Sequence, residues 1–327
     1  MRTLFDHLAP KYPILNAGMG GGLAGSALVA AVNEVGGLGV LGAGAMPPHL
    51  IKQHVADTRA HTSRPIGASI IMPMSDGSNI EACFDAKIEM LVLSWGDPQP
   101  FVADAHKRGM FIVSQCGNAT DASDAADAGV DAVIIQGTEA GGHVQAVAPL
   151  AETLAATVRA LGSVPVIAAG GIADGQGIAD ALSAGARAVS LGTRFVATAE
   201  AAAQHDYKRR IVNARAEQTV ITKLFDIGWP DANHRVIRNS TIDAWEAAGR
   251  PTSGHRPGEG ETVGIYAVGD MTIAIPRYAV YPATEGFEGD IEATALYAGE
   301  SVDHISTVKP AAEVVATLVA ELQSAQA

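Results

Sequence analysis

The chain has 327 residues, of which 48% are hydrophobic and 17% are charged, a composition typical of a globular protein with one large domain or two smaller ones. It carries 22 basic and 35 acidic side chains, which give a formal net charge of −13. This acidity, without any basic run of five residues, argues against general affinity for nucleic acid or anionic membranes, because phosphates are neutralised by clustered cations.

Two cysteines, Cys83 and Cys116, are too few for a disulfide framework and indicate a reducing compartment. The first ten residues mix charged and apolar side chains and do not resemble a signal peptide. The longest apolar stretches, such as 23–32, fall short of the roughly 18 residues that a membrane span needs. We therefore expect a cytoplasmic protein that binds neither membrane nor nucleic acid.

Eight short apolar runs are predicted to be strands, each followed by a glycine or proline turn and then by a segment with helical periodicity. In chain order the expected strands are 12–16, 38–41, 66–71, 90–94, 111–114, 130–136, 164–168 and 188–191. Apolar strands that alternate with helices indicate a parallel sheet covered by helices. The count of eight favours a closed (β/α)8 TIM barrel over an open doubly wound sheet, because the first turn lacks a clean dinucleotide fingerprint.

The alternation stops near residue 200, and the chain then carries scattered charges together with Trp229 and Trp245. We expect this part to be a helical extension that forms a lid. Apolar residues at helical spacing over 310–322 predict a final helix that packs back on the barrel. The expected domains are an FMN-binding TIM barrel at 1–200, a lid and substrate extension at 201–295, and a C-terminal segment that returns to the barrel at 296–327.

Two glycine-rich loops follow the seventh and eighth expected strands, and strand-end loops are where a barrel carries its functional groups. Gly170 and Gly171 begin the first loop, and Gly192 precedes Thr193 in the second. Glycines let backbone N–H groups approach an anion closely, and these strand positions often bind phosphate. Each turn alone could be ordinary, but two at adjacent strands favour a phosphate site.

The loop after the sixth strand places Gly141 and Gly142 directly before His143. An imidazole suits general base catalysis because its ordinary pKa lies near neutrality. A lone histidine is more often a helix cap or a core residue, but the glycine-rich setting at a strand end favours a catalytic role. No histidine pair has the spacing of a zinc helix and the two cysteines are far apart, so we expect no metal site.

The loop after the first strand offers a third candidate site, over residues 16–22. The main chain of Ala17 and Gly18 could lie against a flat ring with Met19 as a soft apolar contact, although a plain tight turn is the alternative. A phosphate site on one side and a base on the other leave room for a phosphorylated planar cofactor. FMN fits better than NAD, which would require a GxGxxG turn with an acidic residue about 20 positions later.

With these motifs the sequence resembles the nitronate monooxygenase family, formerly called 2-nitropropane dioxygenases. The matching stretches are PILNAGMGG, EVGGLGVLGAG, AGVDAVIIQGTEAGGH, VPVIAAGGIADGQGIADALSAGARAVSLGTRF and YAGESVDHI. They are specific for this flavin-dependent barrel and less specific for the reaction. FMN-dependent enoyl-acyl-carrier-protein reductases and certain NADH:quinone reductases share the AGGH signature.

The resemblance implies an FMN-dependent enzyme that oxidises alkyl nitronates with O2 to a carbonyl compound and nitrite. His143 occupies the position of the family's catalytic base, which would also deprotonate a neutral nitroalkane. An NAD(P)H-dependent FMN reductase acting on a quinone or an enoyl thioester is the alternative. The residues implied to contact FMN are Ala17, Gly18, Met19, Ser69, Gln136, Gly141, Gly170, Gly171, Gly192 and Thr193.

Several residues near the expected site depart from the family pattern, among them Ser69 and Glu300. Ser69 stands where a flavin-contacting asparagine is common, and Glu300 replaces the usual glutamine and puts a charge near the pocket. Tyr278 and Tyr281 are candidates for the pocket wall on the lid side, with packing inside the lid as the alternative. Trp95, at the end of the fourth strand, is expected to face the pocket. The sequence leaves open the substrate, the electron donor and whether the chain forms a homodimer.

Overall fold

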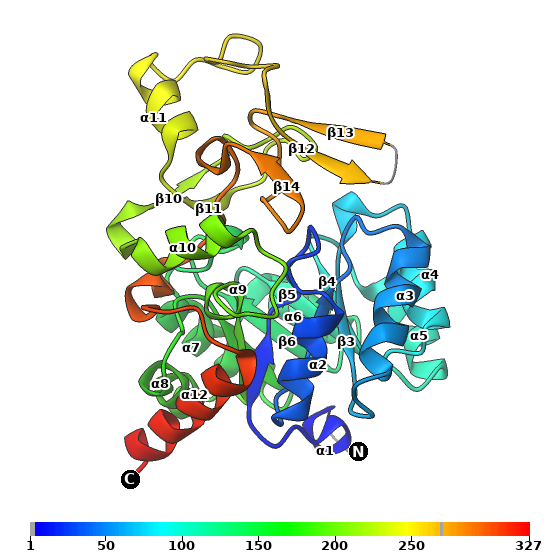
Figure 1. Cartoon of the computed structure of the whole chain (residues 1–327). Helices are drawn as coiled ribbons and strands as arrows, with labels where there is room; N and C mark the ends of the chain where they lie inside the picture. The colour runs from blue at the N-terminus through cyan, green and yellow to red at the C-terminus, as the bar shows by residue number, and fades with distance from the viewer. Residues whose placement is uncertain (1–3, 269–270) are drawn as a thin grey trace.

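Eight parallel strands with interleaved helices form the body of the molecule in the computed structural model, which describes residues 4–268 and 271–327 (Figure 1). The strands pair in the order β1-β9-β8-β6-β5-β4-β3-β2. A parallel bridge between Leu15 and Leu38 brings the two ends of this row together, so the sheet is a nearly closed barrel and the expected TIM barrel is confirmed. The first three residues of the expected barrel domain lie outside the described part of the chain.

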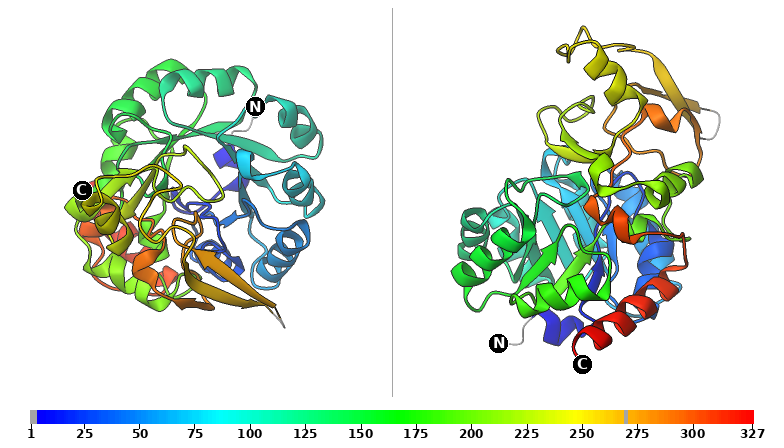
Figure 2. Two further views of the ribbon diagram at one scale, coloured as in Figure 1. Left: turned by 90° about the horizontal axis from the view of Figure 1, so that it is seen from above. Right: turned by 90° about the vertical axis from the view of Figure 1, so that its left-hand side faces the viewer.

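All eight barrel strands fall on the apolar runs predicted from the sequence, with ends that differ by at most two residues. The strands are β1 (Ile14–Asn16), β2 (Val40–Gly42), β3 (Gly67–Ile71), β4 (Met90–Ser94), β5 (Phe111–Cys116), β6 (Ala132–Gln136), β8 (Val166–Ala169) and β9 (Ala188–Leu191). The helices of the barrel half are α1 (Leu4–Leu8), α2 (Ser26–Glu34), α3 (Pro48–Arg59), α4 (Ser78–Asp85), α5 (Gln99–Lys107), α6 (Ala119–Asp127), α7 (Leu150–Leu161), α8 (Gly175–Ser183) and α9 (Thr193–Val196), with a 3-10 turn η1 (Met72–Met74). Seen from above, helices surround the strands as a ring (Figure 2).

The barrel strands are buried on both faces, which explains why they are continuously apolar in sequence. Residues that point inward, such as Val92, Val113 and Ile134, form one cluster with Leu4 and Leu8 of α1. Helix α1 therefore closes the amino-terminal end of the barrel. The carboxyl ends of the strands open on the opposite side, beneath the lid (Figure 1).

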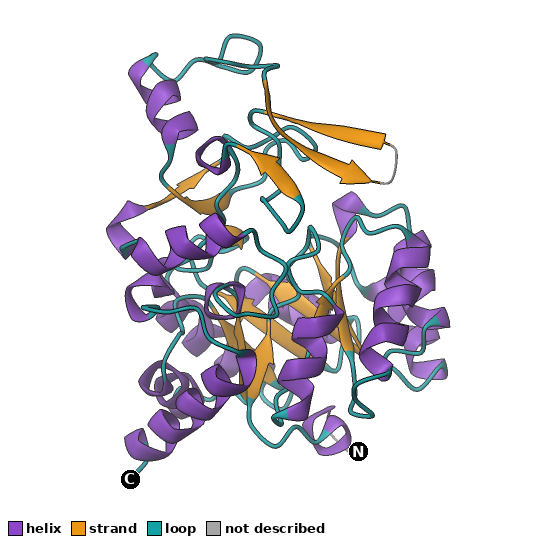
Figure 3. Cartoon of the chain, in the orientation of Figure 1, coloured by secondary structure: helices purple, strands orange, loops and turns teal. Residues whose placement is uncertain are grey.

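The segment after the barrel is richer in strand than expected, and the extension is corrected from helical to mixed helix and strand (Figure 3). It contains α10 (His205–Asn213), η2 (Ala216–Gln218), β10 (Thr219–Thr222), β11 (His234–Ile237), α11 (Ser240–Ala247), β12 (Thr262–Val268), β13 (Met271–Pro276), β14 (Phe287–Gly289) and η3 (Ile291–Ala293). Residues 262–268 and 271–276 are rich in β-branched side chains, which favour strand. They form one antiparallel sheet in the order β13-β12-β14.

A second small sheet joins the lid to the barrel. Its order is β10-β11-β7, and β7 (Gly142–His143) belongs to the loop after barrel strand β6. Strand β11 runs antiparallel to β7, with His234 opposite His143. The lid is thus hydrogen-bonded directly to the loop that carries the candidate base.

The C-terminal segment returns to the barrel as η4 (Glu300–His304) and α12 (Ala311–Ala325), as the helical spacing predicts. The buried face of α12, which includes Val314, Leu318 and Leu322, joins the main core and packs beside α8 and α2. Within the described residues, no helix combines the length and the apolar character needed to cross a membrane.

Candidate active site

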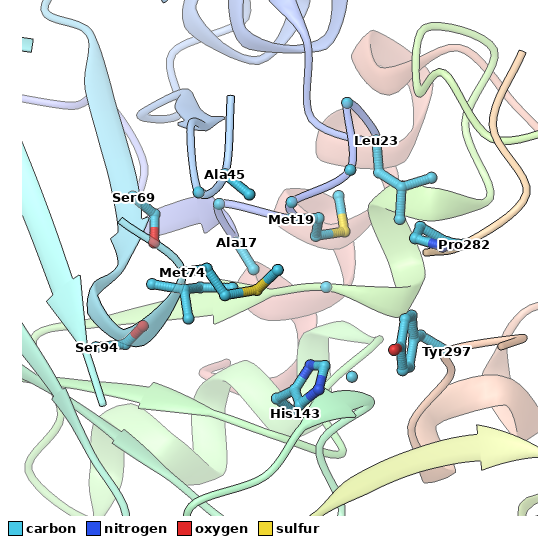
Figure 4. Close-up of a pocket in the computed structure, with 18 of the residues that line it drawn as sticks. Ala17, Met19, Leu23, Ala45, Ser69, Met74, Ser94, His143, Pro282 and Tyr297 are labelled. Atoms are coloured by element: carbon cyan, nitrogen blue, oxygen red, sulfur yellow. The ribbon is translucent and has the colours of Figure 1, made fainter. Parts of the chain in front are cut away.

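A cavity of about 440 Å³ lies at the carboxyl ends of the barrel strands, under the lid. Loops after β1, β2, β3, β4, β6 and β9 contribute to it, together with lid residues 280–282. His143 and Tyr297 lie on one side of it, and Ala17, Met19 and Ser69 on the other (Figure 4). Among the described residues, no lysine or arginine lines this cavity.

The main chain after β1 forms a smooth wall of the cavity because it carries almost no side chains. A Cβ on Gly18 would lie only 2.2 Å from the Cβ of Ser69, so this loop packs directly against β3. A Cβ on Gly192 would meet only the Ala17 Cβ, at 3.9 Å. The space beside Gly192 is therefore open, and a side chain at this position would project into it. Because glycine has no side chain, a flat group can approach the backbone here.

Gln136, at the end of β6, fixes the path of the loop that carries His143. Its side-chain amide donates to the backbone oxygen of His143 at 3.1 Å and accepts from the backbone N–H of Gln145 at 2.9 Å. Gly141 packs so closely on the C-terminal segment that a Cβ would lie 2.4 Å from the Gly299 nitrogen. The loop geometry is thus fixed from two sides.

The four residues predicted to bind phosphate separate into two pairs. Gly192 and Thr193 line the cavity, and the Thr193 hydroxyl oxygen accepts a hydrogen bond from the Gly299 N–H at 2.9 Å. Gly170 and Gly171 have φ values of +115° and +72°. They pack against residues 137–140 and do not line the cavity.

The His143 ring is enclosed by aromatic side chains. Trp229 of the lid stacks on it, with ring centroids 4.2 Å apart and planes inclined by 24°. Tyr297 and His234 lie at 5.5 and 5.3 Å, and Trp95 approaches edge-on at 6.5 Å. The Nε2 atom of His143 is buried and has no hydrogen-bond partner in the described chain. A buried polar atom without a partner is uncommon in native proteins and singles out this ring as a candidate functional group.

Both histidines at the junction of barrel and lid are neutral at neutral pH. Burial, reinforced by the neighbouring His234, lowers the pKa of His143 to about 3. Burial also lowers the pKa of His234 to about 4. The His234 Nδ1 lies 3.0 Å from the Ala232 oxygen and its Nε2 accepts from the Phe225 N–H at 3.3 Å, which satisfies both nitrogens of the neutral ring.

Arg235 links the lid, the AGGH loop and the C-terminal segment behind the histidines. Its guanidinium donates twice to the Thr138 oxygen, at 2.8 and 3.0 Å, and once to the Thr219 hydroxyl at 2.9 Å. It also pairs with Glu300 at 3.0 Å. Glu300, expected to put a charge near the pocket, is therefore neutralised by a buried arginine.

A family model of nitronate monooxygenases matches residues 2–90 and 74–321 of this chain. The chain belongs to the nitronate monooxygenase family. It is therefore an oxidoreductase of a flavin-dependent enzyme family, and it has the fold expected of one.

Individual relatives carry two kinds of name. The chain is 32% identical over 278 residues to a nitronate monooxygenase of Paraburkholderia phytofirmans, covering 68% of this chain and 73% of the relative. It is 34% identical over 254 residues to a (3aS,4S,5R,7aS)-5-hydroxy-7a-methyl-1-oxo-octahydro-1H-indene-4-carboxyl-CoA dehydrogenase of Mycobacterium tuberculosis, covering 76% of this chain and 70% of that enzyme. The structure of a nitroalkane oxidase from Streptomyces ansochromogenes aligns over 96% of both chains, with a TM-score of 0.79 and 27% identity.

Most of the site residues predicted from the sequence lie around one cavity of this nitronate monooxygenase family member. Those that line it are Ala17, Gly18, Met19, Ser69, Trp95, Gln136, Gly141, His143, Gly192, Thr193 and Tyr281. Tyr278 does not line it: the side chain is fully buried within the lid, and its hydroxyl donates to the Pro257 oxygen at 2.7 Å. Its φ of +70° lies in the left-handed region, and Tyr281 shares the cavity with its neighbour Pro282 instead.

Tyr297, which lines the cavity, and Trp229 and Arg235, which pack around the His143 loop outside it, are not identified from the sequence. Tyr297 lies inside the YAGESVDHI stretch that matches the family, so the motif contained the signal for it. The sequence shows Trp229 only as a tryptophan in the expected lid, and it gives no signal that separates Arg235 from the other charged residues there. Their positions depend on the β7–β11 pairing and lid docking, which no local pattern encodes.

Proposed function

We propose that the protein is an FMN-dependent nitronate monooxygenase that oxidises alkyl nitronates with O2 to a carbonyl compound and nitrite. It also accepts neutral nitroalkanes, which His143 deprotonates. The observation that supports this best is the buried, unpartnered Nε2 of His143 in an aromatic enclosure at the wall of the cavity. A neutral imidazole with no partner of its own is suited to accept a proton from bound substrate.

FMN fits the residues present. The glycine-lined wall beside Ala17 and Met19 offers a surface for a flat ring, since a Cβ at Gly192 would project into otherwise open space. Ser69 and Gln136 would lie near the ring edge, and the backbone at Gly192 and Thr193, which lines the cavity, would hold the phosphate. When bound there, FMN supplies the oxidation and reduction chemistry.

His143 is assigned the proton transfer from a neutral nitroalkane. The C–H bond beside the nitro group breaks, its electron pair remains on the substrate as the nitronate, and the proton passes to a ring nitrogen of His143. The low pKa of the isolated imidazole reflects burial, and the nitronate formed beside it offsets that cost by pairing with the imidazolium. A nitronate supplied from solution does not need this step.

The alternative is an enzyme that acts on a CoA thioester or takes electrons from NAD(P)H. Similarity to the Mycobacterium tuberculosis carboxyl-CoA dehydrogenase favours this reading. Against it, CoA and NAD(P)H bring several phosphates of their own, and no lysine or arginine lines the cavity in the described residues. A small substrate suits such a cavity better.

The test is oxygen uptake and nitrite release by the FMN-loaded protein with propyl-2-nitronate and with 2-nitropropane. We expect turnover of both, and we expect His143→Gln to lower kcat/KM for 2-nitropropane by about two to four orders of magnitude while sparing the nitronate. A yellow, fully loaded protein that oxidises neither compound would overturn the proposal. Anaerobic bleaching by NADH or NADPH within the mixing time would instead favour the reductase.

A further inference from the structure

Trp229 of the lid stacks on the face of the imidazole proposed to act as base. Its ring centroid lies 4.2 Å from that of His143, with the planes inclined by only 24°. Trp95 packs edge-on against Trp229 at 5.0 Å. Tyr297 and His234 are titratable groups whose rings face the same imidazole.

The lid holds Trp229 in place through a tight turn. The backbone N–H of Trp229 donates to the backbone oxygen of Asp226 at 3.1 Å, and the Asp226 carboxylate pairs with the buried Arg256 at 2.8 Å. Next to it, Ile227 and Val280 are joined by a backbone hydrogen bond of 3.0 Å. Trp229 is itself a buried residue, with 9% of its surface exposed. The stack is therefore a fixed feature of the docked lid.

We propose that Trp229 is a positioning residue whose indole face stabilises the protonated form of His143 during proton abstraction. The inference rests on the proposed function and deepens it. An indole face carries negative electrostatic potential and attracts a cation stacked on it, by an amount worth about 3- to 30-fold in an equilibrium constant. A neutral imidazole gains little from the same face.

The stabilisation by Trp229 affects one step only, the transfer of a proton from a neutral nitroalkane to His143. His143 carries a positive charge only after it has taken the proton from a neutral carbon acid, and the electron pair of the broken C–H bond stays on the substrate. Oxidation of a nitronate supplied ready-made bypasses that charge. Trp229 should therefore assist turnover of nitroalkanes and leave turnover of nitronates almost unchanged.

The experiment compares Trp229→Phe and Trp229→Leu with the wild type on 2-nitropropane and propyl-2-nitronate. We expect kcat/KM for 2-nitropropane to fall about threefold in W229F and tenfold in W229L, with the nitronate rate within twofold. Trp245→Leu is the matched control, since Trp245 lies in α11 and bonds to the Pro251 oxygen at 2.9 Å, away from the cavity. Equal losses on both substrates, or no loss on either, would overturn the proposal.

A second measurement does not depend on turnover. NMR titration of His143 in 13C-labelled protein should give its highest pKa in the wild type, a lower value in W229F and the lowest in W229L. The reverse order would show that the indole acts by excluding water, and the proposal would fail. If the wild type oxidises neither substrate, the proposed function has failed, and this order alone supports or overturns the role of Trp229.

Discussion

His143 and His234 face each other across the antiparallel pair formed by β7 and β11, with ring centroids 5.3 Å apart. One belongs to a barrel loop and the other to the lid, so their contact is made only when the lid is docked. His234 is buried and His143 is half-buried at the cavity wall, and loss of hydration lowers the pKa of His143 to about 3 and that of His234 to about 4, so both rings are neutral at neutral pH. Protonation of either ring therefore opposes docking of the lid.

The stability of the folded chain should fall as the pH drops from about 6.5 towards 4. The unfolded chain takes up protons on these histidines near the ordinary value of 6.5, whereas the folded chain does so only near 3 to 4. The stabilisation is thus fully present above pH 6.5 and is lost as the pH falls, by up to about 1.4 kcal/mol per pH unit for each histidine.

Urea unfolding at pH values between 4.5 and 7.5 measures this dependence. His143→Gln should reduce the slope of unfolding free energy against pH over the acid part of this range. The sign is a test in itself: a variant that loses more stability on acidification than the wild type would show that His143 is protonated in the folded protein.

Alanine substitutions at two cavity glycines should affect different properties, stability at Gly18 and FMN affinity at Gly192. Gly18→Ala places a Cβ 2.2 Å from the Ser69 Cβ, so it should destabilise the barrel itself by about 1–3 kcal/mol. Gly192→Ala meets nothing closer than 3.9 Å, so the protein without cofactor should keep its Tm while its FMN affinity falls roughly tenfold. Thermal unfolding and flavin fluorescence titration separate the two effects, and unchanged FMN affinity in G192A would contradict the placement of the cofactor.

The barrel could be predicted from the sequence because its signals are local. Strands buried on both faces appear in sequence as continuous apolar runs, and Gly18 after β1 and Gly170 after β8 stand where the backbone approaches other groups closely. His143 was recognisable for the same reason, since its glycine pair and its strand-end position are adjacent in sequence. All of these features can be recognised from local sequence, without knowledge of contacts between distant residues.

The lid could not be predicted to the same depth because its organisation depends on long-range contacts. Arg235 reaches Thr138 and Glu300, and Trp229 reaches His143, across segments that only the tertiary fold brings together. Tyr278 shows the same limit within a short motif, because its left-handed backbone accompanies a side chain buried in the lid core.

Loss of the Arg235 guanidinium should destabilise the junction of barrel and lid. Arg235→Met leaves the Thr138 oxygen and the Glu300 carboxylate without their partner, at a cost of about 3–5 kcal/mol. Glu300→Gln, which restores the residue usual in the family, should change stability by less than about 1 kcal/mol, because 41% of the Glu300 side chain is exposed. Urea unfolding of the two variants measures both, and equal effects would show that the ion pair, rather than the hydrogen bonds to Thr138, stabilises the junction.

The two lid tyrosines that follow β13 should separate stability from substrate binding. Tyr278 is fully buried and lies under the Arg256 guanidinium, 4.2 Å from its ring centroid, so Tyr278→Ala should cost about 3–5 kcal/mol of stability. Tyr278→Phe removes only the hydrogen bond to Pro257 and should cost about 1 kcal/mol. Tyr281 is 45% exposed at the rim of the cavity.

Tyr281→Ala should therefore leave the free energy of unfolding within about 0.5 kcal/mol of the wild type. Its KM for a nitronate should rise about two- to tenfold, since an aromatic contact contributes roughly 0.5–1.5 kcal/mol. Denaturant unfolding and steady-state kinetics on the three variants give both quantities. An unchanged KM in Y281A would place the bound substrate away from the lid, deeper between His143 and the glycine wall at Ala17 and Gly192.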